Sequence, residues 1–292
     1  MPDPTRAADV TTVTTVSTGG ARLHTEIHGP EDAPTLVLAH GWTCNTTFWH
    51  GVVRRLVPDF RVVLYDQRGH GRTPATPGNC STDSLADDLC AVLEFTLAPG
   101  QPAIVGGHSM GAMTILAAVN RPVFRERAAA VLLCSTGADR LTGESTVLPL
   151  RPGNLRRLGQ RYFLTTTLPY GGVTPVSKRV VHYITMGKGA SQRQRNEMTR
   201  MVAAAPRKAR GEWGRVLAGL DLSQNVAQLD KPVTIVQGTA DRLTPAVHAH
   251  RIAGRLPRRP EFIELPGIGH MTPVEATDTV SDALRALAKD HL

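Results

Sequence analysis

The stretch "VGGHSMGA", residues 105–112, decides the fold of this chain. It places Ser109 between Gly107 and Gly111, directly after a short apolar run and directly before a segment of helical character. A serine on a tight turn between a strand and a helix exposes its hydroxyl above the sheet, beside the helix N-terminus. Such a turn crowds the residues two positions away on either side, so both must be very small. The pattern predicts a nucleophilic serine; a glycine-rich turn that only packs a helix on a sheet is the alternative.

A base and an acid for this serine follow two later strands. Asp241 comes after the strand in "VTIVQGTADRLTP", and His270 lies in the glycine-rich loop of "FIELPGIGHMTPVE". Because the carboxyl ends of parallel strands meet at one edge of a sheet, both side chains can reach the serine. Ser109, Asp241 and His270 are therefore the predicted catalytic residues. Three alternatives stay open: Asp241 caps the next helix, Asp139, after the strand "AAVLLC", is the acid, or His270 has a surface or helix-capping role.

Two backbone amides are needed to stabilise the oxyanion of an acyl-transfer reaction. One is the amide of Met110, which follows the serine, and the other is that of Trp42 in the loop "HGWTCNTTFWH", after the strand "TLVLA". Gly41 and His108 stand next to these positions, and we predict that they contact the substrate. The ring of Trp42 either forms a wall of the acyl pocket or packs in the core.

Short apolar runs alternate with segments of helical spacing along most of the chain. Fully apolar strands of this kind belong to a parallel sheet that helices cover on both faces. The alternation stops over residues 138–229, which are polar, basic and mostly helical, with interruptions such as "RPGN", "LPYGGVTP" and "AAPRK". We predict an α/β domain with a mostly parallel, twisted sheet from residues 1–137 and 230–292, and a helical insertion at 138–229. The expected strands are 10–17, 22–28, 35–39, 61–65, 103–105, 129–134, 232–238 and 261–265, and the expected helices outside the insertion are 48–56, 81–97, 110–119, 245–256 and 274–288.

The positive charge of the chain is concentrated in this insertion. The 292 residues carry a formal net charge of +8, yet residues 140–215 alone contain 15 Lys and Arg against three acids. The segment has few aromatic residues and no nucleic-acid-binding motif, so we expect no nucleic-acid partner. A solvated helical surface explains the charge, and attraction of an anionic substrate or partner is the alternative.

Composition sets further expectations about location and cofactors. No segment approaches the ~18 consecutive apolar residues of a membrane span. The start "MPDPTRAADV" lacks the basic-then-apolar pattern of a secretory signal, so we expect a cytoplasmic protein. The four cysteines show neither CxxC nor zinc-ligand spacing and are expected to be reduced thiols; they are Cys44, Cys80, Cys90 and Cys134. We expect no metal and no cofactor, and the sequence leaves the oligomeric state open.

These residues resemble the α/β-hydrolase fold superfamily over nearly the whole chain. The matching pieces are "HGW", "YDQRGHGRT", "GHSMGA", "GTADRLTP" and "GIGHMTPVE", in the expected order and at the expected intervals. The resemblance implies that residues 138–229 form a cap, or lid, that shapes substrate choice. It also implies that the loop with Asp66, Arg68 and His70 is structural rather than catalytic. "GHSM" with a short cap is similar to the serine esterases and cofactor-free perhydrolases of the superfamily.

The nucleophile separates the reactions within this superfamily. Epoxide hydrolases and haloalkane dehalogenases carry an aspartate where this chain has Ser109, and proline iminopeptidases carry an acidic cap where this one is basic. The resemblance implies a serine hydrolase that cleaves carboxylic esters of small or medium acyl groups through an acyl-enzyme on Ser109. Two other functions stay open: a thioesterase or acyl transferase on CoA- or carrier-protein-bound acyl groups, and a non-hydrolytic pocket protein such as a biosynthetic cyclase or ligand receptor.

Overall fold

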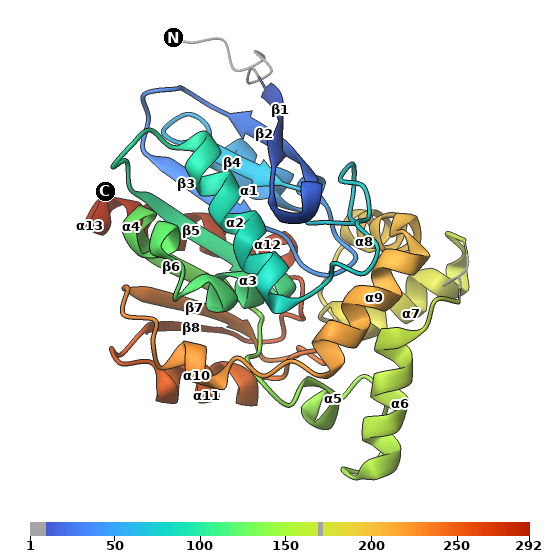
Figure 1. The fold of residues 1–292 in the computed structure, drawn as a ribbon. Coiled ribbons are helices and arrows are strands. Elements are labelled where there is room, and N and C mark those ends of the chain that lie inside the picture. The colour runs from blue at the N-terminus through green and yellow to red at the C-terminus, as the bar shows by residue number, and fades with distance from the viewer. Residues whose placement is uncertain (1–9, 169–171) are drawn as a thin grey trace.

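The computed structural model describes residues 10–168 and 172–292, and one eight-stranded sheet forms its centre (Figure 1). The strand order is β1-β2-β4-β3-β5-β6-β7-β8. β2 pairs antiparallel with β1 and β4, and the other neighbouring pairs are parallel. The predicted α/β fold with a mostly parallel sheet is therefore confirmed. The strands are β1 (Val10–Val16), β2 (Arg22–His28), β3 (Thr35–Ala39), β4 (Arg61–Tyr65), β5 (Ala103–His108), β6 (Ala128–Cys134), β7 (Val233–Gly238) and β8 (Glu261–Leu265).

Helices cover both faces of the sheet because successive strand residues point to opposite sides. In β3, Val37 and Ala39 belong to one apolar core, whereas Leu36 and Leu38 belong to the other. Figure 1 shows α2, α3 and α4 in front of the sheet. Outside the segment between β6 and β7, the helices that contribute to the first core are α2 (Thr82–Thr96), α3 (Met110–Ala118), α4 (Pro122–Arg127) and α11 (Ala246–Arg255), and those that contribute to the second are α1 (His50–Leu56) and α13 (Thr277–His291).

Four details of the helices differ from the expectation. The final helix is interrupted at Ala276, whose φ of −130° and ψ of 50° cannot continue a helix, so α12 (Thr272–Glu275) is separate from α13. The short helix α4 was not predicted, although Pro122 in its first turn is a helix-start signal. A 3-10 turn, η2 (Thr46–Trp49), precedes α1, and another, η1 (Thr18–Gly20), closes the predicted hairpin.

The segment between β6 and β7 is helical and lies at one end of the sheet (Figure 1). Pro175 and a capping box between Thr174 and Ser177 begin α7. Toward its end the segment returns to the sheet, because Leu222 and Val226 pack in the same core as α2 and α3. The expected interruption "LPYGGVTP" includes residues 169–171, which lie outside the described residues. The helices of the segment are α5 (Leu141–Glu144), α6 (Asn154–Thr165), α7 (Pro175–Thr185), α8 (Gln192–Ala204), α9 (Arg207–Ala218) and α10 (Ser223–Val226).

Within residues 10–168 and 172–292, no helix has the length and apolar character needed to cross a membrane. Residues 1–9, on which the expectation about a secretory signal depended, lie outside the described residues. The cytoplasmic location stays a prediction.

Candidate active site

Ser109 occupies the sharp turn between β5 and α3. Its φ of 51° and ψ of −115° hold it in a backbone conformation that L-residues rarely adopt. A Cβ on Gly107 would lie 2.5 Å from the backbone of Gly111, and a Cβ on Gly111 would lie 2.1 Å from the carbonyl oxygen of Ala39. Both glycines are therefore required by the close approach of backbone to backbone around the serine.

Gly111→Ala should lower the free energy of unfolding by about 3 kcal/mol, because neither the turn nor β3 can retreat from the added methyl group. Guanidinium denaturation measures the change. Gly254→Ala is the matched control: this glycine lies in α11 with no atom within 4 Å of the added Cβ. That substitution should raise the stability by about 0.5–1 kcal/mol. A Gly111→Ala protein as stable as the wild type would contradict the steric requirement.

His270 and Asp241 form a buried hydrogen-bonded pair above the ends of β7 and β8. His270 Nδ1 donates to Asp241 Oδ2 at 2.7 Å, and the Thr244 hydroxyl donates to the same oxygen at 2.9 Å. The other carboxylate oxygen accepts the amides of Leu243 and Thr244, each at 2.9 Å. Asp241 therefore fixes the loop that leads into α11 and, at the same time, holds the proton of His270 on Nδ1, which leaves Nε2 free to accept a proton.

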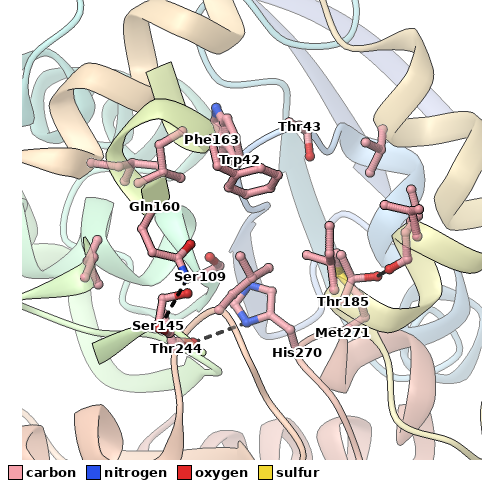
Figure 2. Close-up of a pocket in the computed structure, with 18 of the residues that line it drawn as sticks. Trp42, Thr43, Ser109, Ser145, Gln160, Phe163, Thr185, Thr244, His270 and Met271 are labelled. Atoms are coloured by element: carbon pink, nitrogen blue, oxygen red, sulfur yellow. Dashed lines mark hydrogen bonds between the residues drawn. The ribbon is translucent and has the colours of Figure 1, made fainter. Parts of the chain in front are cut away.

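Ser109 and His270 line the same cavity, and Figure 2 shows both facing its interior. Among the described residues, no hydrogen bond joins the serine hydroxyl to the imidazole. Of the three predicted catalytic residues, the structure thus joins two directly and brings the third to the same cavity. Catalytic hydrogen bonds are often formed only when substrate is present, so this geometry is compatible with proton transfer.

Asp139, the alternative acid, lies elsewhere. It does not line the cavity, and it forms ion pairs with Arg251 at 2.9 Å and Arg255 at 2.6 Å. Burial raises the pKa of its carboxyl group, but the two arginines outweigh this and hold the pKa below its usual value. Asp139 is therefore committed to an ion-pair cluster away from His270.

The amides of Trp42 and Met110 are free to bind an oxyanion. Neither donates a hydrogen bond to any acceptor in the described part of the chain. Gly41 brings the Trp42 loop close to the nucleophile, because a Cβ at Gly41 would lie 3.2 Å from the Cβ of Ser109 and 2.8 Å from Nδ1 of His108. Gly41 itself is not among the residues that line the cavity. The structure shows only that Gly41 lets the Trp42 loop approach Ser109 closely; the contact of Gly41 with substrate stays a prediction.

His108 contacts His270 through a hydrogen bond and through its ring. It is buried, and its Nε2 donates to the backbone carbonyl of His270 at 2.9 Å, since a carbonyl can only accept. Its ring packs against those of Phe48 and His270, with centroid distances of 4.5 and 4.8 Å. Burial, together with the neighbouring imidazole, lowers the pKa of His108 well below its usual value, so the ring stays neutral. His108 also borders the cavity, and its contact with substrate stays a prediction.

The cavity has a volume of about 320 Å³ and is mostly apolar. None of the described residues that line it is Lys, Arg, Asp or Glu. Trp42 forms one wall: its ring meets that of Phe163 edge-on at 6.2 Å, and its Nε1 donates to the carbonyl of Arg210 at 3.0 Å. The Trp42 ring therefore lines the cavity and also links the loop after β3 to α9; whether the cavity holds an acyl group stays a prediction.

Sequence reasoning missed most of the cavity wall. Gln160 and Phe163 come from α6, and Val180 and Ile184 come from α7. The helical spacing of apolar residues in "PVSKRVVHYIT" was a signal for the inner face of α7. Thr244, three residues after Asp241, was also missed, and only its hydrogen bonds reveal its part in orienting the pair.

Two features near the site have structural roles. In the loop after β4, Arg68 forms two hydrogen bonds of 2.7 and 2.6 Å with the carboxylate of Asp88, and both side chains are buried. Asp66 accepts the amides of Thr46 and Arg72. Burial raises the pKa of the Cys44 thiol to about 12, so the thiol stays protonated and unreactive.

Comparison with known proteins identifies the class. Residues 36–283 match the alpha/beta hydrolase family, and the chain belongs to this family. The resemblance found in the sequence is thereby confirmed.

Relatives within the family carry names that refer to ester cleavage. The chain is 25% identical over 270 residues to a bifunctional esterase/perhydrolase of Acinetobacter calcoaceticus, with 89% of this chain and 94% of the relative covered. It is 29% identical over 257 residues to the pimeloyl-[acyl-carrier protein] methyl ester esterase of Nitrosomonas europaea, with 86% and 93% covered. Its fold is similar to that of a thermophilic esterase from Thermogutta terrifontis, with a TM-score of 0.78, 24% identity, and 98% and 100% coverage.

Proposed function

We propose that the protein is a serine hydrolase that cleaves carboxylic esters of small or medium acyl groups. One observation carries the proposal: the Asp241-oriented imidazole of His270 and the strained Ser109 face one apolar cavity. A volume of about 320 Å³ is at the lower end for small-molecule sites, which supports a short acyl chain. In this proposal residues 138–229 are the cap, since their helices supply most of the cavity wall.

The proposed reaction proceeds through an acyl-enzyme. His270 Nε2 takes the proton of the Ser109 hydroxyl as its oxygen attacks the ester carbonyl, and the amides of Trp42 and Met110 stabilise the resulting oxyanion. The intermediate expels the alcohol, which receives the proton from His270. Water then attacks the acyl-enzyme with His270 again as base, and the carboxylic acid leaves.

The proposal is tested by p-nitrophenyl esters of increasing acyl length together with a fluorophosphonate probe. We expect turnover to be highest for short and medium acyl groups, and we expect the probe to label the protein stoichiometrically at Ser109. Labelling without turnover of any ester would instead favour a specialised biosynthetic enzyme. A protein that neither reacts with the probe nor hydrolyses esters would be a ligand receptor or a non-hydrolytic cyclase.

A thioesterase or acyl transferase on CoA- or carrier-protein-bound substrates is the second candidate. A second space of about 940 Å³, which we call the basic groove, is lined by Arg140, Arg157 and Arg161 and by one acidic residue, Glu144. Thr142 borders both this groove and the cavity that Ser109 and His270 line, which we call the acyl cavity. Phosphates of such a carrier could bind there while the acyl group enters the neutral cavity.

Salt dependence separates the two candidates. If the groove binds a phosphorylated leaving group, kcat/KM for a short-chain acyl-CoA should fall at least about fivefold between low and high ionic strength. The value for an uncharged p-nitrophenyl ester should change little, because the cavity wall carries no charged side chain. Equal salt dependence for both substrates would contradict the second candidate.

A further inference from the structure

Exposed apolar side chains gather on two helices beside the cavity. Of the 14 large apolar side chains that are exposed in the described residues, nine lie between residues 150 and 183. Single exposed apolar residues are ordinary, but a concentrated set marks an interaction surface. We define the apolar cap face as Leu155, Leu158 and Tyr162 on α6, with Val176, Val180 and Tyr183 on α7.

The spacing of these residues shows that each helix presents one apolar stripe. The α6 residues are three and four apart and the α7 residues four and three apart, which places each set on one side of its helix. The acyl cavity does not explain the α6 stripe, because none of its three residues lines it. Val176 and Val180 do line the cavity and are 72% and 49% exposed, so the α7 stripe extends from the cavity wall to the surface.

The charged residues of the two helices that form this face are all basic, although Glu144 lies in the groove that Leu158 borders. Between Glu144 and Glu197 none of the 52 residues is acidic, and nine are Lys or Arg. Arg157 and Arg161 on α6 and Arg179 on α7 are exposed beside the apolar stripes. An apolar stripe flanked by arginine is the pattern of a helix that lies in the interface of an anionic membrane.

We propose that the apolar cap face docks on the surface of an anionic phospholipid bilayer, with α6 and α7 in the interfacial region and the mouth of the cavity toward the lipid. The leucine and tyrosine side chains enter the boundary of the acyl chains, while the arginines pair with headgroup phosphates. A second copy of the chain fits this face poorly, since it would bring two acid-free basic segments together. A nucleic acid would match the charge but would leave the leucines exposed. Docking of this kind would deliver lipid-dissolved esters to the cavity.

Co-sedimentation of the whole protein with vesicles tests the proposal. We expect binding to vesicles of phosphatidylcholine mixed with phosphatidylglycerol, much weaker binding to phosphatidylcholine alone, and release from the mixed vesicles by added salt. The double variant Leu155→Ser/Tyr162→Ser should lower the partition coefficient at least about tenfold. Phe95→Ser is the matched control: this side chain is 57% exposed on α2, on the sheet domain, and its removal should leave partitioning unchanged.

Folding and catalysis are monitored separately from docking. Far-UV circular dichroism and hydrolysis of p-nitrophenyl acetate should be unchanged in the double variant, because neither substituted residue borders the acyl cavity or the basic groove. Sedimentation needs no turnover, so failure of the proposed esterase reaction would leave this test intact. Equal binding to both kinds of vesicle, no binding, or unchanged binding of the double variant would overturn the proposal. The proposal would also be overturned if the protein does not bind lipid but forms a dimer that the two substitutions dissociate. Binding of duplex DNA that the double variant retains, again without binding of lipid, would overturn it as well.

Discussion

Ser109→Ala should lower kcat for p-nitrophenyl acetate about 10⁵-fold while leaving the protein folded. Alanine removes the oxygen that attacks the ester, and water in the cavity cannot replace it because no acyl-enzyme then forms. The substitution removes one small atom from a half-exposed side chain, so little change in stability is expected. The measurement is steady-state hydrolysis together with a thermal unfolding curve.

Ser135 provides a matched control for this variant. It follows β6 as Ser109 follows β5, and its φ of 46° is close to the 51° of Ser109. Its hydroxyl lies 3.1 Å from that of Thr272 and does not border the cavity. Ser135→Ala should retain kcat within about threefold. Undiminished hydrolysis by the Ser109→Ala protein would remove the proposed mechanism.

Asp241→Asn should lower kcat about 10⁴-fold, by fixing the wrong tautomer of His270. The amides of Leu243 and Thr244 donate to Oδ1, so they will hold the oxygen of an asparagine in that position. The NH₂ group of the asparagine then faces Nδ1 of His270, which must accept rather than donate. The proton moves to Nε2, and the imidazole can no longer take the proton of Ser109. The pH-rate profile and kcat of the variant measure the effect.

Asp139→Asn tests whether Asp139, the alternative acid, acts on His270 in place of Asp241. The carboxylate of Asp139 pairs with Arg251 and Arg255, so its neutralisation should lower the melting temperature and leave kcat within about threefold. A collapse of kcat in the Asp139 variant, with near-normal turnover in the Asp241 variant, would reverse the assignment. The two substitutions make the same chemical change, which makes the comparison direct.

Most of the sheet domain could be predicted because its signals are local. Fully apolar strands alternate with helical periodicity, and this alternation already indicates a parallel sheet covered on both faces. The sharp turn at Ser109 could be predicted for the same reason, since the glycines at 107 and 111 are a steric requirement of one short turn; the catalytic role of Ser109 stays a prediction. The break between α12 and α13 could not, because it depends on the backbone at one residue, Ala276, within an otherwise helical pattern.

The sequence by itself determined the succession of strands and helices along the chain, the glycine-flanked turn at Ser109, and the concentration of positive charge between residues 140 and 215. Each of these depends on residues that are close together in the chain. Only the tertiary structure decided which aspartate meets His270, that α6 and α7 close a cavity without charged walls, and that the charge lies outside it. These features depend on contacts between segments far apart in the chain. The periodicity of apolar residues indicates which face of a helix is apolar, but it does not indicate which segment packs against that face.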